Sequence, residues 1–448
     1  MQIRFYLRNR PRSPVCRHGG FIMRTFIRKG WISAALVVLS AMILLNVSGC
    51  SVTPSYAMDL MEGITADGTV TFKELKDESI LKASDFALKL FKACRENGQN
   101  TLVSPLSVIA ALSMTANGAG GETLSQIESL FGMDIDELNA FTGSYLKSFT
   151  GGDKCKVNIA DSIWFDDSKG FVPEKDFLQT NANYYNASLY KAPFNDETVK
   201  EINAWVNKNT DQTIPEIIAK LPQNSIMVIL NALAFEAEWL DVYETQNVRE
   251  GNFTGEDGSQ KTAEFMYGKE SLFLKDDKAT GFIKRYSGGK YAFAAMLPDE
   301  GVTISEYVGY LNGENIQKTL AGRENCTVYT SIPKFEAECS FDLKDRLISL
   351  GMKDAFDQNN ADFSRIGSLT NGNIYVNGVV HKTYIKVDEK GTKAGAATAV
   401  IFGENSADLD FKEVYLDRPF VYMLIDLETN IPFFIGVMSD TESSVTSH

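Results

Sequence analysis

The hydrophobic positions of this chain follow a helical period mainly in its first half and a strand period mainly in its second half. Apolar residues at three- and four-residue spacing predict helices, and alternating or continuous apolar runs predict strands. Thr123 and Gln126 predict a capping box at the third helix. We find no fixed-period repeat, which favours one mixed domain. The predicted helices cover residues 80–94, 105–117, 123–131, 177–185, 199–206 and 343–350, and the predicted strands cover residues 157–165, 227–233, 291–298, 327–335, 374–387 and 417–425.

One segment between the last two predicted strands has strand length but no large charged face. At the two-residue period of a strand, one face is small or apolar and uncharged, and Glu404 is the first charged residue in that phase. A strand that could be buried therefore runs from residue 392 to residue 402. The alternative is a flexible surface loop, which such a composition usually indicates. The residues on the uncharged face are Thr392, Ala394, Ala396, Thr398, Val400 and Phe402.

The start of the chain has the pattern of an export signal. Residues 1–49 contain eight basic and no acidic side chains, and an apolar run over residues 31–47 leads to Ser48-Gly49-Cys50. A basic segment, a short apolar segment and small residues before a cut predict a cleaved signal whose Cys50 becomes the lipidated first residue. The alternative is a retained membrane anchor. Met23 begins a segment of ordinary signal length, so the residues before it receive no function.

These patterns divide the chain into four expected parts. They are an export signal (1–49), a lipidated cysteine with a tether (50–78), a folded domain (79–440) and a disordered tail (441–448). The folded part is expected outside the cytoplasm, either lipid-anchored on the outer side of a bacterial membrane or secreted.

The charge and the cysteines restrict the partners. The formal net charge is −14, and it becomes −22 without the basic first 49 residues. So acidic a surface repels phosphate backbones, which excludes nucleic acid as a partner. The cysteines of the folded part show no metal-binding spacing and are interpreted as buried thiols, with one disulfide as the alternative. They are Cys94, Cys155, Cys326 and Cys339.

The scarcity of histidine argues against an enzyme. Of the three histidines, His18 lies in the signal region, His448 is the last residue, and His381 lies in an apolar strand. A hydrolase triad needs an accessible imidazole, and His-rich metal sites need several histidines. His381 is therefore interpreted as a core histidine bonded to hydroxyl and amide groups. No enzymatic activity, cofactor or metal is expected.

Several motifs in a fixed order carry a resemblance to a known family. They are Ser104-Pro105-Leu106-Ser107, Asn231-Ala232-Leu233-Ala234-Phe235 with Trp239, Ile332-Pro333-Lys334-Phe335, Val380-His381-Lys382, the segment from Glu389 to Thr398, Arg418-Pro419-Phe420 and Phe433-Phe434-Ile435-Gly436. With these motifs the chain resembles the serpin family over residues 80–440. The resemblance implies an α+β fold in which helices pack on a large central mixed β-sheet, with further sheets and an exposed reactive-centre loop.

The resemblance also implies a mechanism, the suicide inhibition of a serine or cysteine protease by a monomer. The protease attacks the loop and forms a covalent complex, and it is displaced when the cut loop enters the sheet as a strand. The implied scissile bond is Asn405-Ser406, with cleavage after Phe402, after Glu404 or near Asp408 as alternatives.

The resemblance assigns roles to three further groups of residues. The implied hinge of the loop contains Glu389, Gly391, Thr392, Ala394, Ala396, Ala397 and Thr398; a cluster that controls sheet opening contains Ser104, Ser107, Asn231 and His381; and Trp239 marks the breach, where the loop enters the sheet. Lys393 and Gly395 depart from the family hinge. Lys393 lies on the solvent face and should be tolerated, and Gly395 is expected to slow insertion slightly through the cost of ordering glycine. The alternative function is a non-inhibitory, serpin-like binding or scaffold protein, for which bulky or charged in-phase hinge residues would be typical.

Overall fold

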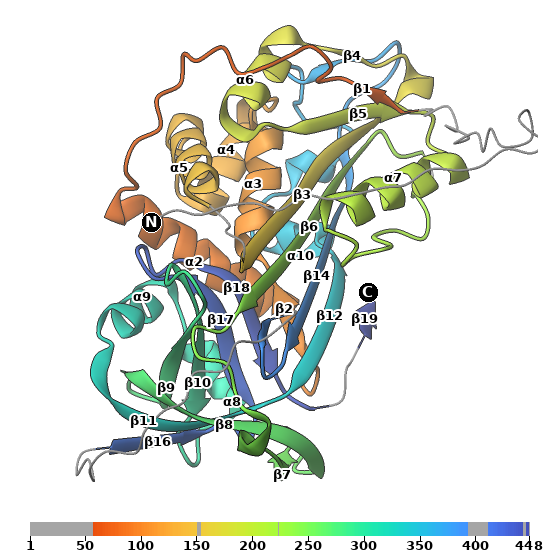
Figure 1. Ribbon diagram of the computed structural model, residues 1–448. Helices are drawn as coiled ribbons and strands as arrows, with labels where there is room; N and C mark the ends of the chain where they lie inside the picture. Colours follow the sequence, from red (N-terminus) through yellow and green to blue (C-terminus); the bar gives the residue numbers. More distant parts are fainter. Residues whose placement is uncertain (1–56, 150–153, 223, 393–410, 442–444, 448) are drawn as a thin grey trace, which may run out of the picture. The chain divides into compact units, whose positions relative to one another are not determined.

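The computed structural model describes residues 57–149, 154–222, 224–392, 411–441 and 445–447 (Figure 1). The chain divides into two compact units, Met1–Pro54 and Ser55–His448. The first unit, with the predicted export signal and Cys50, lies outside the described residues, so the fold below is that of the second. In the described ranges no helix is both long and apolar enough to cross a membrane.

Nine α-helices occur among the described residues. Most follow the predicted apolar stripes, and α3 begins with Pro105 at its first turn, where the missing N–H costs no helical hydrogen bond. The helices are α2 (Asp77–Cys94), α3 (Pro105–Ala116), α4 (Gly121–Phe131), α5 (Ile135–Ser148), α6 (Lys175–Tyr185), α7 (Asp196–Asn209), α8 (Ile304–Tyr310), α9 (Gly313–Ala321) and α10 (Lys344–Ser349).

The predicted capping box at the third helix is wrong. Helix α4 begins at Gly121, with Gly120 as an N-cap that makes no side-chain bond. The Thr123 hydroxyl accepts instead from the Asp362 N–H, and the Gln126 side chain accepts from the backbone of Lys353. Both side chains therefore hold a distant loop rather than the helix end.

The strands form two large sheets and one small one. In the first sheet the order is β1 (Met58–Asp59), β5 (Ser188–Ala192), β3 (Cys155–Asp166), β6 (Met227–Glu238), β15 (Gly391–Thr392), β14 (Val376–Val387), β12 (Phe335–Asp342) and β19 (Val445–Ser447). In the second the order is β16 (Phe411–Tyr415), β11 (Glu324–Pro333), β8 (Gln260–Lys275), β9 (Ala279–Arg285), β10 (Tyr291–Pro298), β17 (Phe420–Asp426), β18 (Pro432–Met438) and β2 (Thr101–Val103), with β7 (Val248–Thr254) paired to β8. The third pairs β13 (Gly367–Ser368) with β4 (Val172–Pro173).

The first sheet is mixed and is covered on both faces. Strands β3 and β6 are antiparallel, whereas β6 and β14 are parallel. Helix α7 lies on one face, over a cluster that includes Trp164, Ile202 and Leu230, and α3 lies on the other (Figure 1). Strand β6 is therefore almost wholly buried, as its continuous apolar run predicted. The predicted fold class, helices packed on a large mixed sheet, is confirmed.

Two segments differ from their predictions. The single strand predicted over residues 327–335 is two strands, because the chain leaves the second sheet after Pro333 and enters the first at Phe335. The described part of the predicted tether contacts the domain: β1 pairs with β5, and the Phe72 ring meets the Tyr184 ring edge-on. Apolar residues in this part are too sparse to show a period, so the sequence pattern did not predict these contacts.

Candidate functional site

The start of the predicted hinge lies between two strands of the first sheet. Strand β14 ends at Val387, the chain turns at Asp388, and the two residues of β15 pair with β14 on one side and β6 on the other. Thr392 is fully buried there. A Cβ on Gly391 would lie 2.0 Å from the Ala237 carbonyl oxygen, so the approach of the two backbones requires glycine.

Aromatic side chains hold this entry point. The Thr392 hydroxyl shares a hydrogen bond of 2.6 Å with the Tyr286 hydroxyl. The Tyr286 ring stacks on Trp239 at 4.5 Å between centroids, and the Trp239 indole N–H donates to the Asp388 carbonyl at 2.9 Å. Glu389 pairs with Lys334 at 3.0 Å. The structure thus places Trp239, Glu389, Gly391 and Thr392 in one contact network.

Beyond this entry point the sheet is closed. Strands β6 and β14 pair directly with each other from Val376 opposite Met227 to Tyr384 opposite Ala234. Any longer insertion of the chain after Thr392 must therefore separate these two strands.

The other four predicted side chains meet in the middle of this closed pair. His381 of β14 lies opposite Asn231 of β6, and both contact the start of α3. The Ser104 N–H donates to His381 Nε2 at 3.0 Å, and the Ser107 hydroxyl donates to Asn231 Oδ1 at 2.9 Å. We call Ser104, Ser107, Asn231 and His381 the cross-strand cluster; all four are fully buried.

The geometry fixes the proton of His381. Because Nε2 accepts from Ser104, the proton lies on Nδ1, which contacts Asn231 Oδ1. Burial lowers the pKa of His381 to about 3, so the ring is neutral. A neutral imidazole without solvent contact serves as a structural link from β14 to Asn231 of β6 and to Ser104 at the start of α3.

Asp161 extends this cluster and was missed in the sequence. It lies on β3 opposite Asn231, whose side-chain N–H donates to Asp161 Oδ1 at 2.5 Å. Burial raises the pKa of Asp161 well above its ordinary value of 3.8, although the hydrogen bond from Asn231 opposes the shift. The sequence does contain a signal: Asp161 occupies the phase of Val157, Ile159 and Ile163, where a carboxyl is unexpected.

We expect Asp161 to make the stability of the protein fall with rising pH. The pKa of Asp161 is higher in the folded than in the unfolded protein, so the protonated carboxyl favours folding. This contribution to the free energy of unfolding is fully present below about pH 3.8 and is lost as pH rises through the folded pKa. Within that interval each pH unit changes the free energy of unfolding by up to about 1.4 kcal/mol. Urea unfolding of wild type and Asp161→Asn from about pH 4 to 8 measures this. Parallel pH profiles of the two proteins would contradict it.

The remaining predicted residues lie outside the described residues. They are Ala394, Ala396, Ala397, Thr398, Phe402, Glu404, Asn405, Ser406 and Asp408. The chain resumes at Phe411 in β16, which pairs with β11 in the second sheet. Residues 393–410 therefore connect the two large sheets.

A family model described as Serpin (serine protease inhibitor) matches residues 81–441 of the chain. The chain belongs to the serpin family. Among solved structures it is similar to the thermophilic serpin tengpin in the native state, with a TM-score of 0.83 and 41% identity over 86% of this chain and 100% of that one. The latent state of tengpin gives a TM-score of 0.74 and 38% identity over 83% of this chain and 100% of that one. The predicted serpin fold is thus confirmed.

Two further relatives are similar to this chain over most of their own length. An uncharacterized serpin-like protein of Thermococcus kodakarensis is 29% identical over 82% of this chain and 87% of its own. Leukocyte elastase inhibitor A of Rattus norvegicus is 28% identical over 78% of this chain and 96% of its own. The structure shows no disulfide among Cys94, Cys155, Cys326 and Cys339, and all of these except Cys326 are buried.

One expectation about the hinge of this serpin needs correction. The hinge pattern predicts that Thr392 becomes buried when the loop is cut and inserts. The structure buries Thr392 in the uncut chain, because Gly391 allows β15 to enter the gap between Ala237 and Val387. The first step of insertion is therefore already made.

Proposed function

We propose that this serpin is a suicide inhibitor of a serine or cysteine protease. The observation that carries the proposal is the position of Thr392, buried between β6 and β14 and followed by in-phase residues that are all small or apolar up to Phe402. A strand that has begun to pair at one end can extend without a new nucleation step. The small or apolar in-phase side chains after Thr392 can be buried at little energetic cost.

The chemistry belongs to the protease, and the serpin supplies a substrate bond and a driving force. The protease nucleophile adds to the carbonyl carbon of the scissile bond, for which Asn405-Ser406 is our first candidate. The peptide C–N bond breaks, the new amine leaves with the C-terminal segment, and an ester or thioester joins the two proteins. Insertion of the segment 392–402 into the first sheet then carries the acyl-enzyme away from the place where the protease cut the loop.

The free energy that insertion would supply is comparable to the free energy of unfolding of a protein domain. Thr392 is already paired, and the ten residues that follow it up to Phe402 would pair on both edges. On the order of 10–20 new ladder hydrogen bonds would form, and at about 1 kcal/mol each they supply roughly 10–20 kcal/mol. This is similar to the whole stability of a typical domain, about 5–15 kcal/mol. Insertion could therefore distort a bound protease before deacylation.

We expect proteases that cut the loop to form a complex that survives SDS. The experiment incubates the purified protein with a panel of serine and cysteine proteases and separates the products on denaturing gels. Mass spectrometry of the released C-terminal fragment then identifies the bond, expected between residues 399 and 410. Cleavage there by many proteases with no SDS-stable complex from any of them would favour the non-inhibitory binding or scaffold alternative.

We also propose that the mature protein is lipid-anchored through Cys50 on the extracytoplasmic face of a bacterial membrane. The basic and apolar segments and the small residues before Cys50 support this proposal. Cys50→Ala is expected to leave the signal uncut and to lose lipid attachment, whereas Cys326→Ala is a control that removes a cysteine of the folded domain. Radiolabelled fatty-acid incorporation and intact mass measure both effects. Equal labelling of Cys50→Ala and wild type would favour another attachment.

A further inference from the structure

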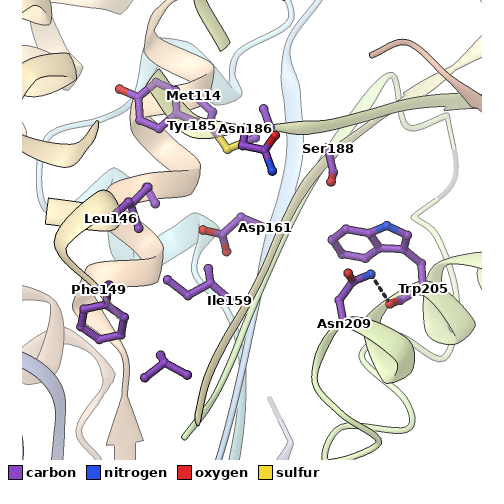
Figure 2. Close-up of a pocket in the computed structure, with 13 residues that line it drawn as sticks. Met114, Leu146, Phe149, Ile159, Asp161, Tyr185, Asn186, Ser188, Trp205 and Asn209 are labelled. Carbon is purple, nitrogen blue, oxygen red and sulfur yellow. Dashed lines mark hydrogen bonds between the residues drawn. The ribbon is translucent and has the colours of Figure 1, made fainter. Parts of the chain in front are cut away.

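A cavity of about 310 Å³ lies beside β3, between the helices on one face of the first sheet and the C-terminal end of α7 (Figure 2). Its walls include Met114 of α3, Leu146 of α5, and Val157 and Ile159 of β3. Strand β3 pairs with β5 only from Ser162 onward, so residues 155–161 of β3 have no β5 residue paired with them. The volume is at the lower end of the range of small-ligand sites, roughly 300–1,000 Å³. We call this space the β3 cavity.

One acid lines the β3 cavity. Figure 2 shows the Asp161 carboxyl beside Ile159 and facing Leu146, with Trp205 and Asn209 across the strands. One carboxyl oxygen accepts from Asn231, and the other accepts no hydrogen bond from the residues that the structure describes. Within these residues no lysine, arginine or histidine pairs with Asp161, and the other lining side chains carry no charge at neutral pH. The site therefore has one acid without a paired cation, beside apolar side chains and uncharged polar groups.

We propose that the β3 cavity binds a small organic ammonium ion, with its charged group on the second carboxyl oxygen of Asp161 and its apolar part against Met114, Leu146 and Phe149. An ammonium group offers the donors that this oxygen lacks and compensates the burial of a negative charge. Neither an anion nor a neutral alcohol of the same size would gain an ion pair with Asp161. The proton of a neutral Asp161 passes to solvent on binding, so binding strengthens as pH rises.

Binding at Asp161 also acts on the cross-strand cluster. A charged carboxylate accepts a stronger hydrogen bond from Asn231 than a neutral carboxyl does. Asn231 contacts His381 across the junction of β6 and β14, the two strands that separate if the sheet opens. We therefore expect the ligand to stabilise the closed sheet. Binding itself does not depend on the proposed inhibitory function.

Thermal unfolding of the intact protein with benzylammonium tests the proposal, with benzyl alcohol and benzoate as compounds of similar size. Benzylammonium at ten times its dissociation constant is expected to raise the melting temperature by about 2 °C, and the rise should be larger at pH 8 than at pH 6. Benzyl alcohol and benzoate should give little or no rise. Equal rises with benzylammonium and benzyl alcohol, or no rise at millimolar benzylammonium, would overturn the proposal.

Three variants locate the binding. Asp161→Asn keeps the shape and the acceptor for Asn231 but should lose the preference for benzylammonium. Asp136→Asn removes a negative charge from the exposed first turn of α5 and should keep the preference for benzylammonium. Val157→Phe fills the β3 cavity without changing Asp161 and should abolish the rise. The proposal is wrong if Asp161→Asn and Val157→Phe both respond to benzylammonium as wild type does.

Discussion

Thr392→Arg is expected to leave the loop cleavable but to reduce covalent trapping at least about tenfold, since an uncompensated buried charge costs roughly 3–5 kcal/mol. Thr392 has no exposed surface, and its hydroxyl contacts Tyr286 rather than a carboxylate. An arginine at position 392 must therefore leave the gap between β6 and β14. The residues after it would then have to insert without the pairing that residue 392 provides. The ratio of SDS-stable complex to cleaved serpin measures the effect.

Two conservative variants are the controls for this prediction. Thr392→Ser keeps the hydroxyl that bonds Tyr286 and should trap nearly as wild type does. Thr392→Val keeps the shape but leaves the buried Tyr286 hydroxyl without this partner. Its covalent trapping should therefore lie between that of the serine variant and that of the arginine variant. An arginine variant that traps like wild type would show that burial of Thr392 is not required.

Cleaved wild-type protein is expected to unfold at a temperature roughly 10–20 °C above that of the intact protein. The reason is the same strand insertion: residues that follow Thr392 would gain ladder partners on both β6 and β14. Differential scanning calorimetry before and after limited proteolysis between residues 399 and 410 measures the difference. Irreversible unfolding makes the comparison one of apparent temperatures at equal scan rate.

The same measurement on Thr392→Arg separates insertion from cleavage. The cleaved variant should show little of the rise, because its first inserting residue carries a charge that the gap between Ala237 and Val387 cannot solvate. Equal melting temperatures for intact and cleaved wild type would mean that the loop does not insert. The binding or scaffold alternative would then be the better account of this serpin.

Local pattern predicted the elements whose signals lie within a few residues. The stripe of α2 and the alternation of β14 predicted both ends to within three residues, and the apolar run of β6 predicted its start but ended five residues short. Helices α5, α8 and α9 were missed, although side-chain caps at Asp134, Thr303 and Asn312 mark their starts. The short lengths of α8 and α9 give too few apolar positions to show a period.

By itself the sequence determined the serpin family through motifs in fixed order, the α+β fold, and the placement of His381 in an apolar strand. Only the tertiary structure decided that Asp161 and Asn231, seventy residues apart, share a hydrogen bond, and that Thr392 is buried before any cleavage. Periodicity records which face of a strand is apolar, but not which strand lies beside it. The depth of hinge entry depends on Gly391 meeting Ala237, a contact between segments more than 150 residues apart that exists only once the sheet has formed.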